Sequence, residues 1–158
     1  MTQTEIVQVL TGFIGTLGFA FLFNIRGGRM AAAAIGGLIS WALLCVLNNF
    51  VESEAVNYFV VALVMSFYAE IMARIMKTPT TTFVTTTLIP LIPGGSLYYT
   101  MAYAFSGNLE SFVQKAIDTL QLASALALGI IVSAMVTKAV CAIPVGRASG
   151  TWRGKQRS

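Results

Sequence analysis

The chain has 158 residues, of which 56% are hydrophobic and only 10% are charged, and its mean hydropathy is +0.78. Soluble domains carry charges on roughly a quarter of their residues, so this composition predicts an integral membrane protein with a small positive net charge. Histidine is absent and there are only two cysteines. This excludes histidine-based acid–base chemistry and the usual zinc motifs, and we expect no metal, no cofactor and no enzymatic activity.

Five apolar segments are long enough to cross a bilayer, which takes about 20 residues in an α-helix. The connections between them are too short to form a soluble domain. We therefore predict an all-α integral membrane protein with one membrane domain, residues 1–146, followed by a basic cytoplasmic tail, residues 147–158. The predicted transmembrane helices cover residues 6–23, 30–50, 55–76, 83–105 and 120–143.

Basic residues occupy alternate connections between the predicted spans. Arg26 and Arg29 follow the first span, Lys77 follows the third, and four more basic residues lie in the tail at 147–158. With five spans these three regions fall on one side of the membrane, which the positive-inside rule assigns to the cytoplasm. We therefore predict an inner-membrane protein of bacteria with its N-terminus outside and its C-terminus inside. The tail is interpreted as an anchor; a lipid- or nucleic-acid-binding patch is the alternative, and we expect no nucleic-acid partner.

Small residues recur at every third or fourth position in three of the spans. Such stripes let helix backbones approach closely in lipid. They predict a tightly packed bundle, with the stripes meeting either within this chain or against another subunit. The residues are Gly12, Gly15 and Gly18 in the first span, Ala32, Gly36 and Ser40 in the second, and Ala125, Gly129 and Ser133 in the fifth.

An amphipathic segment, residues 109–119, precedes the fifth span, and Asn108 is its predicted N-cap. A helix continuous over residues 109–143 would be about 50 Å long, which exceeds the thickness of the hydrocarbon core. Its first turns should therefore project from the membrane, lie along its surface, or bend.

Glu70 and Arg74 are charged residues inside the third span. They are four residues apart, so they share a helix face and can pair, which reduces an insertion cost of about 2.5–3.5 kcal/mol for a lone charge. Two interpretations follow. The pair either anchors the cytoplasmic end of the helix, or Glu70 faces a water-filled pathway and carries a proton or binds a substrate ammonium, while Arg74 holds a substrate carboxylate.

The fourth span and the loop before it read TTTFVTTTLIPLIPGGSLYY. Pro90 and Pro93 remove two backbone donors, and Gly94 and Gly95 remove side-chain cover, so we predict an unwound centre at residues 90–96 with a half-helix on each side. Such backbone persists only where it is buried in protein or lines a cavity, and secondary transporters bind substrates at broken helices. The threonine hydroxyls either bond to the local backbone or face a polar pathway. The predicted pathway residues are Glu70, Arg74, Thr85, Thr86, Pro90, Pro93, Gly94, Gly95, Ser96, Tyr98 and Tyr99.

Three motifs, FNIRGGR after the first span, AEIMARIMKTPTTTF around the end of the third and IPLIPGG in the fourth, resemble the bacterial threonine/serine exporter family. The resemblance is to the C-terminal five-helix half, which also occurs as a separate small subunit that pairs with a larger membrane protein bearing the other half. It implies export of small hydroxy amino acids, and in some split pairs of dicarboxylates such as succinate. The positions that carry it are Glu70, Arg74, Lys77, Pro79, Phe83, Ile89, Pro90, Pro93 and Gly94.

These features together predict a small membrane subunit of a secondary exporter that moves a small carboxylate-bearing metabolite out of the cell. The expected partner is a larger membrane subunit with the complementary half, or further copies of this chain. The sequence contains no P-loop, so an ion gradient is the expected driving force. The alternative is a membrane subunit that assembles or stabilises a larger complex without transporting anything itself.

Overall fold

The computed structural model describes residues 3–142, and within that range every regular element is a helix. This confirms the all-α prediction. The predicted basic tail, residues 147–158, lies outside the described residues. In chain order the elements are α1 (Gln3–Leu22), α2 (Gly28–Asn48), α3 (Glu54–Ile75), α4 (Thr80–Leu88), the short 3₁₀ helix η1 (Ile89–Leu91), α5 (Gly94–Phe105) and α6 (Leu109–Ala142).

Three of these helices, α2, α3 and α6, are long and apolar enough to cross a membrane. They correspond to the second, third and fifth predicted spans. The first predicted span corresponds to α1, which contains a shorter apolar stretch, Val7–Leu22. The fourth, residues 83–105, is divided between α4, η1 and α5, and neither α4 nor α5 alone reaches the length of about 20 residues that a spanning helix needs.

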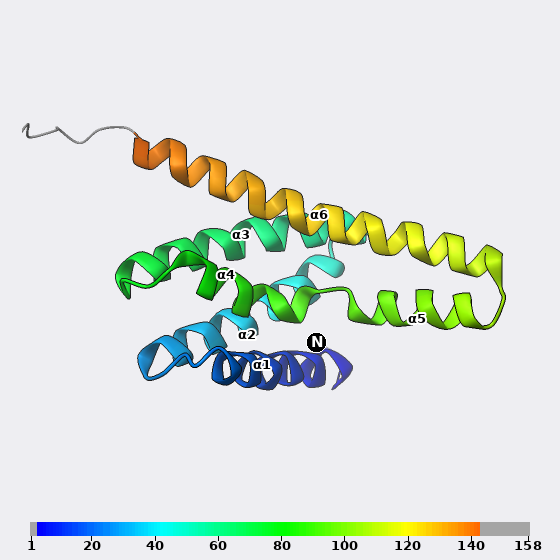
Figure 1. Cartoon of the computed structure of the whole chain (residues 1–158), viewed down its shortest axis with the longest axis horizontal. Helices are drawn as coiled ribbons and strands as arrows, with labels where there is room; N and C mark the ends of the chain where they lie inside the picture. The colour runs from blue at the N-terminus through cyan, green and yellow to red at the C-terminus, as the bar shows by residue number, and fades with distance from the viewer. Residues whose placement is uncertain (1–2, 143–158) are drawn as a thin grey trace, which may run out of the picture.

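The helices α1 to α4 form a bundle in which successive helices run in opposite directions (Figure 1). Within it, α2 packs against α1, α3 and α4, while α6 packs against α3. The buried residues form two clusters, one at the end of the bundle where α1 and α3 finish and one further along it. The first cluster contains Ala20, Ile25, Ala32, Ala33, Ala69, Ala73 and Phe83, and the second Leu44, Val61, Ala62, Met65, Leu88, Leu91 and Leu126.

The small residues of the second and fifth predicted spans meet neighbours within this chain. A Cβ atom at Gly36 would overlap the side chain of Thr87 in α4 and lie 2.8 Å from the ring of Tyr68, and one at Gly129 would lie 2.8 Å from the carbonyl oxygen of Phe59. These distances are too short for a real side chain, so glycine allows α2 to approach α4 and α3 closely and allows α6 to approach α3. By contrast, Gly18 in α1 has no neighbour within 4 Å.

The helices α1 and α3 end in the same kind of turn. Asn24 and Lys77 have positive φ angles of 55° and 50°. The amide of Ile25 donates to the carbonyl of Ala20 at 2.9 Å. The amide of Thr78 donates to the carbonyl of Ala73, also at 2.9 Å. This is the Schellman motif, in which glycine or asparagine usually takes the left-handed position. Asparagine suits it in α1, whereas a lysine is unusual there in α3.

Helix α6 is continuous over 34 residues, and Asn108 caps it as predicted, since its Oδ1 accepts a hydrogen bond from the Ser111 amide at 3.2 Å. Its first turns do not bend; they extend beyond the bundle, with α5 running antiparallel beside them (Figure 1). Within this pair, which we call the α5–α6 arm (residues 94–120), the hydroxyls of Thr100 and Thr119 lie 3.1 Å apart. No residue of α5 is buried.

Candidate functional site

The fourth predicted span is interrupted at Ile92 and Pro93. Proline has no amide hydrogen and clashes with the preceding turn, so Pro90 and Pro93 each disturb the α-helical pattern. Pro90 lies in η1, Ile92 is extended with φ −57° and ψ 127°, and α5 begins at Gly94. The stretch outside any helix is therefore shorter than the predicted range 90–96, because the glycine pair already belongs to α5.

A side chain of α2 satisfies a backbone group beside this interruption. Ser40 is fully buried, and its hydroxyl lies 2.8 Å from the carbonyl oxygen of Gly37 and 3.2 Å from that of Thr87. Thr87 belongs to the last turn of α4, where carbonyl groups lose their helical partners. The hydroxyl therefore connects the end of α4 to α2.

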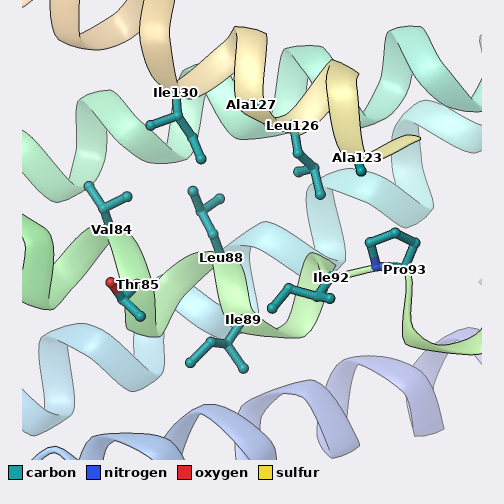
Figure 2. Close-up of a pocket in the computed structure, with 10 residues that line it drawn as sticks. All are labelled: Val84, Thr85, Leu88, Ile89, Ile92, Pro93, Ala123, Leu126, Ala127 and Ile130. Carbon is teal, nitrogen blue, oxygen red and sulfur yellow. The ribbon is translucent and has the colours of Figure 1, made fainter. Parts of the chain in front are cut away.

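An apolar cavity of about 370 Å³ separates the interrupted segment from α6. Leu88 of α4 and Leu126 and Ile130 of α6 extend into the space between the two helices (Figure 2). Among the lining residues only Thr85 has a polar side chain. This surface therefore favours apolar groups, and it offers few hydrogen bonds to replace those that a carboxylate makes with water. The other lining residues are Val84, Ile89, Ile92, Pro93, Ala123 and Ala127.

Pro90 borders a different cavity, of about 270 Å³, on the side of α1. Gln8 and Thr11 contribute polar side chains to this second cavity. Trp41 also lines it, and its indole nitrogen is buried without a hydrogen-bond partner in the described part of the chain. The two prolines of the interruption thus lie on separate cavities.

Four of the six threonines of α4 fall into two groups. Thr86 and Thr87 are buried, and each donates to a carbonyl one turn back at 2.7 Å. Thr82 and Thr85 instead border cavities, including a small one of about 220 Å³ that they share with Phe23 and Thr81. Local backbone bonding therefore accounts for the buried pair, whereas the hydroxyls of Thr82 and Thr85 make no hydrogen bond within residues 3–142.

Glu70 and Arg74 pair as their spacing predicts, with Oε1 and Nη2 3.2 Å apart. The side chain of Glu70 is 25% exposed and that of Arg74 is 53% exposed. The pair lies near the C-terminal end of α3, outside the cavities that border α4.

The remaining predicted pathway residues lie at the start of α5. Tyr98 and Tyr99 contact each other edge to face, with ring centroids 5.5 Å apart, and both side chains are exposed. The predicted pathway residues are therefore not gathered around one cavity of this chain. Those on α5 are Gly94, Gly95, Ser96, Tyr98 and Tyr99.

One polar cavity at the end of the bundle, which we call the basic cavity, was not predicted from the sequence. It has a volume of about 250 Å³ and opens where the connection between α1 and α2 meets the start of α4. Its lining residues are Phe23, Asn24, Ile25, Arg26, Arg29, Thr78, Thr82 and Phe83. Its arginines stand in the motif FNIRGGR and its threonines in KTPTTTF, but the cavity forms only because the end of α1 lies beside the start of α4.

Comparison with known proteins gives a match at the level of a family. The family model described as "Threonine/Serine exporter, ThrE" matches residues 8–136, a range that includes most of α1, all of α2 to α5 and most of α6. Neither the search of curated proteins nor the search of solved structures returned a significant match.

Proposed function

Because this chain belongs to the threonine/serine exporter family, we propose that it is the small membrane subunit of a secondary exporter. The exported solute is a small carboxylate-bearing metabolite, either an amino acid like threonine or serine or a dicarboxylate such as succinate. The subunit acts in a bacterial inner membrane, with its N-terminus outside and its basic C-terminal tail inside.

The observation that carries this proposal is the concentration of cavities around the interrupted fourth segment. Four cavities border α4 or η1, and they extend from the start of α4 to the interruption. Interrupted helices in a membrane persist where their backbone is buried or lines a cavity, and secondary transporters place substrate and ion sites at such points. This arrangement supports a solute pathway along α4.

In the proposed mechanism the solute carboxylate binds where α5 begins. Pro93 is the N-cap of α5, and no side chain caps this helix end. The amide groups of a first helical turn carry partial positive charge and favour an anion. Thr85 borders the adjoining cavity and supplies a hydroxyl, Tyr98 and Tyr99 add polar contacts, and the pair Glu70–Arg74 gates the pathway or couples it to the ion gradient.

A second protein is needed to close this pathway. The cavities around α4 are open in the single chain, and large apolar side chains such as Tyr98 and Leu120 on the α5–α6 arm are 69% and 70% exposed. We propose that the larger subunit, with the complementary half of the exporter, covers α4 and the arm. A second copy of this chain is the other candidate.

A non-transporting assembly subunit is the alternative function. It is favoured by the apolar lining of the cavity between α4 and α6, where Thr85 is the sole polar side chain among the lining residues. In that case the cavity receives an apolar side chain of the partner, and the solute pathway lies in the other subunit.

Efflux from reconstituted vesicles distinguishes the two functions. Vesicles that contain the chain, with and without the complementary subunit, are loaded with labelled threonine, serine or succinate. We expect Gly94→Leu and Glu70→Gln to abolish efflux while complex formation persists. A Cβ at Gly94 meets nothing within 4 Å, so the first atom of the new side chain fits without a clash. Gly18→Leu, at an equally open position in α1, is the matched control.

Normal efflux from correctly inserted Gly94→Leu and Glu70→Gln would contradict the assignment of these residues to the pathway. Formation of the complex without efflux of any of the three solutes would favour the assembly function.

A further inference from the structure

The basic cavity combines a rigid apolar floor with a polar rim. Phe83 is completely buried and Ile25 nearly so, and both belong to the core cluster at this end of the bundle. The rim contains two arginines and two threonines, and the lining includes no acidic residue. A small molecule bound here would therefore meet hydrogen-bond donors on a surface whose position is set by the core.

The side chain of Arg26 is oriented by its neighbour. Asn24 is held in the left-handed turn that ends α1, and its Oδ1 accepts a hydrogen bond from Nε of Arg26 at 2.9 Å. This leaves the two terminal nitrogens of the guanidinium available. Terminal guanidinium nitrogens form the paired hydrogen bonds with which arginine recognises carboxylates.

The groups around the basic cavity carry positive charge, and no acidic residue among its lining residues neutralises the two arginines. Arg29 lies in the first turn of α2, and α4 begins beside the cavity; neither helix has an acidic residue in its first turn or a side-chain cap. A helix N-terminus is partially positive, so a cation there raises the electrostatic energy. Within residues 3–142 neither Arg26 nor Arg29 forms an ion pair.

The basic cavity is also connected to the interruption through shared residues. Thr82 borders both the basic cavity and the small cavity beside Phe23. Thr85 borders that small cavity and also the apolar cavity that reaches Pro93. The two threonines thus form a series of hydroxyl groups along one side of α4, from the arginines to the break in the helix.

We propose that the basic cavity is the first binding site for the carboxylate of the exported solute, on the side of the membrane from which the solute enters. This inference rests on the proposed function and adds a site separate from the interruption. Arg26 binds the carboxylate through its terminal nitrogens, Thr82 donates a further hydrogen bond, and Arg29 attracts the anion. The solute then moves along Thr82 and Thr85 towards Pro93.

Equilibrium binding to the full chain tests this site. The chain is placed in nanodiscs of phosphatidylcholine, which carries no net charge, and titrated with radiolabelled succinate and with radiolabelled L-threonine. We expect Arg26→Gln to weaken binding of at least one of them by about 10-fold or more, because a charged hydrogen-bond donor is lost.

Arg26→Lys keeps the charge but not the paired donors, and should also bind more weakly. Lys138→Gln, which removes an exposed positive charge outside the cavity, is the control and should leave binding unchanged.

Efflux provides the second measurement. In vesicles containing the complex, Arg26→Gln should raise the half-saturating solute concentration on the loading side by a similar factor. If Arg26→Gln and Lys138→Gln bind the solutes equally well, the site is refuted, even when the wild-type complex exports normally. If the wild-type complex exports nothing, the proposed function fails, whereas arginine-dependent binding of a solute would still support the site.

A lipid headgroup is the other possible source of an anion. The titration is therefore repeated in nanodiscs containing phosphatidylglycerol. Solute binding that survives there supports the proposal. If neither solute binds in phosphatidylcholine and Arg26→Gln lowers only the affinity for phosphatidylglycerol, the site holds a lipid phosphate, and its assignment to the solute is wrong.

Discussion

The hydroxyl of Ser40 in α2 lies 3.2 Å from the carbonyl oxygen of Thr87 in α4, just before the fourth segment is interrupted. Both residues are fully buried. Because a buried carbonyl without a partner is costly, this contact fixes the end of α4 against α2. The prolines set where the helical pattern changes, and this contact attaches the α4 side of the interruption to the bundle.

Replacing Ser40 by alanine tests this contact. The Thr87 carbonyl would lose a hydroxyl that it shares with the nearer carbonyl of Gly37. We expect the protein to become less stable by up to about 1 kcal/mol, the usual scale for such bonds in proteins and membranes. Ser66→Ala is the matched control, since the Ser66 hydroxyl is buried but finds no partner among the described residues. Thermal unfolding in detergent measures both, and equal effects of the two substitutions would contradict the role given to Ser40.

Gly129→Ala should loosen the packing of α6 on α3. The added methyl group would lie 2.8 Å from the Phe59 carbonyl oxygen, which belongs to rigid backbone, and overpacking of this kind costs about 1–3 kcal/mol. Gly18→Ala adds the same group where nothing lies within 4 Å and should have little effect. Thermal unfolding is again the measurement, and an unchanged midpoint for Gly129→Ala would show that α3 and α6 are not so close.

Lys77→Gly should stabilise the protein. Lys77 has φ 50° at the end of α3, a conformation that costs an ordinary residue about 1–2 kcal/mol and costs glycine almost nothing. Part of this gain is offset by the greater freedom of glycine in the unfolded chain, so we expect a net increase of about 0.5–1 kcal/mol. Lys77→Val, with a branched side chain, should be destabilising. If Lys77→Val were more stable than Lys77→Gly, residue 77 would not have a left-handed conformation.

Asn24 is expected to act as a positioning residue for Arg26. Asn24→Gly keeps the left-handed turn, since glycine accepts φ 55° without strain, but it removes the acceptor of the Arg26 Nε hydrogen bond. Solute binding to the full chain in nanodiscs should therefore weaken several-fold, while the unfolding temperature stays within a few degrees of the wild type. Asn24→Asp keeps an acceptor but places a negative charge beside the solute carboxylate, so it should bind no better than Asn24→Gly. Binding by Asn24→Gly as strong as that of the wild type would remove Asn24 from the site.

The α5–α6 arm should be the surface on which the partner depends. Leu120→Gln places a polar group at an exposed apolar position of the arm, and we expect it to reduce copurification of the complementary subunit without lowering the stability of the single chain. Leu22→Gln in α1, with a side chain that is 78% exposed against 70% for Leu120, is the control. If both variants retain the partner equally, lipid and not protein covers the arm.

Local features of this chain are predictable from its sequence. The helices α2, α3 and α6 follow from long apolar segments, the Glu70–Arg74 pair from a spacing of four residues, and the Asn108 cap from its position before an amphipathic segment. Each of these depends on residues close together in the chain. The same reasoning identified Pro90 and Pro93 as the place where the helical pattern changes.

Features that depend on packing were not predictable in the same way. The glycine pair was expected in an unwound stretch, but Gly94 and Gly95 are compatible with the first turn of a helix, and Pro93 is a suitable residue to precede it. The basic cavity needs the end of α1 beside the start of α4, and nothing in residues 23–29 or 78–83 by itself indicates that contact. Likewise, the cavities on the two sides of η1 exist only because α1 and α6 lie on opposite sides of it.

The division of the fourth segment also has a mechanical consequence. The α4 half is attached to α2 and α3, the α5 half packs against α6, and the two are joined through Ile92 and Pro93. A rotation of α6 about α3 would carry α5 with it and leave α4 in place, so the change in chain direction would be concentrated in these two residues. The apolar cavity lies beside that hinge, and its volume would change with the angle between the two halves.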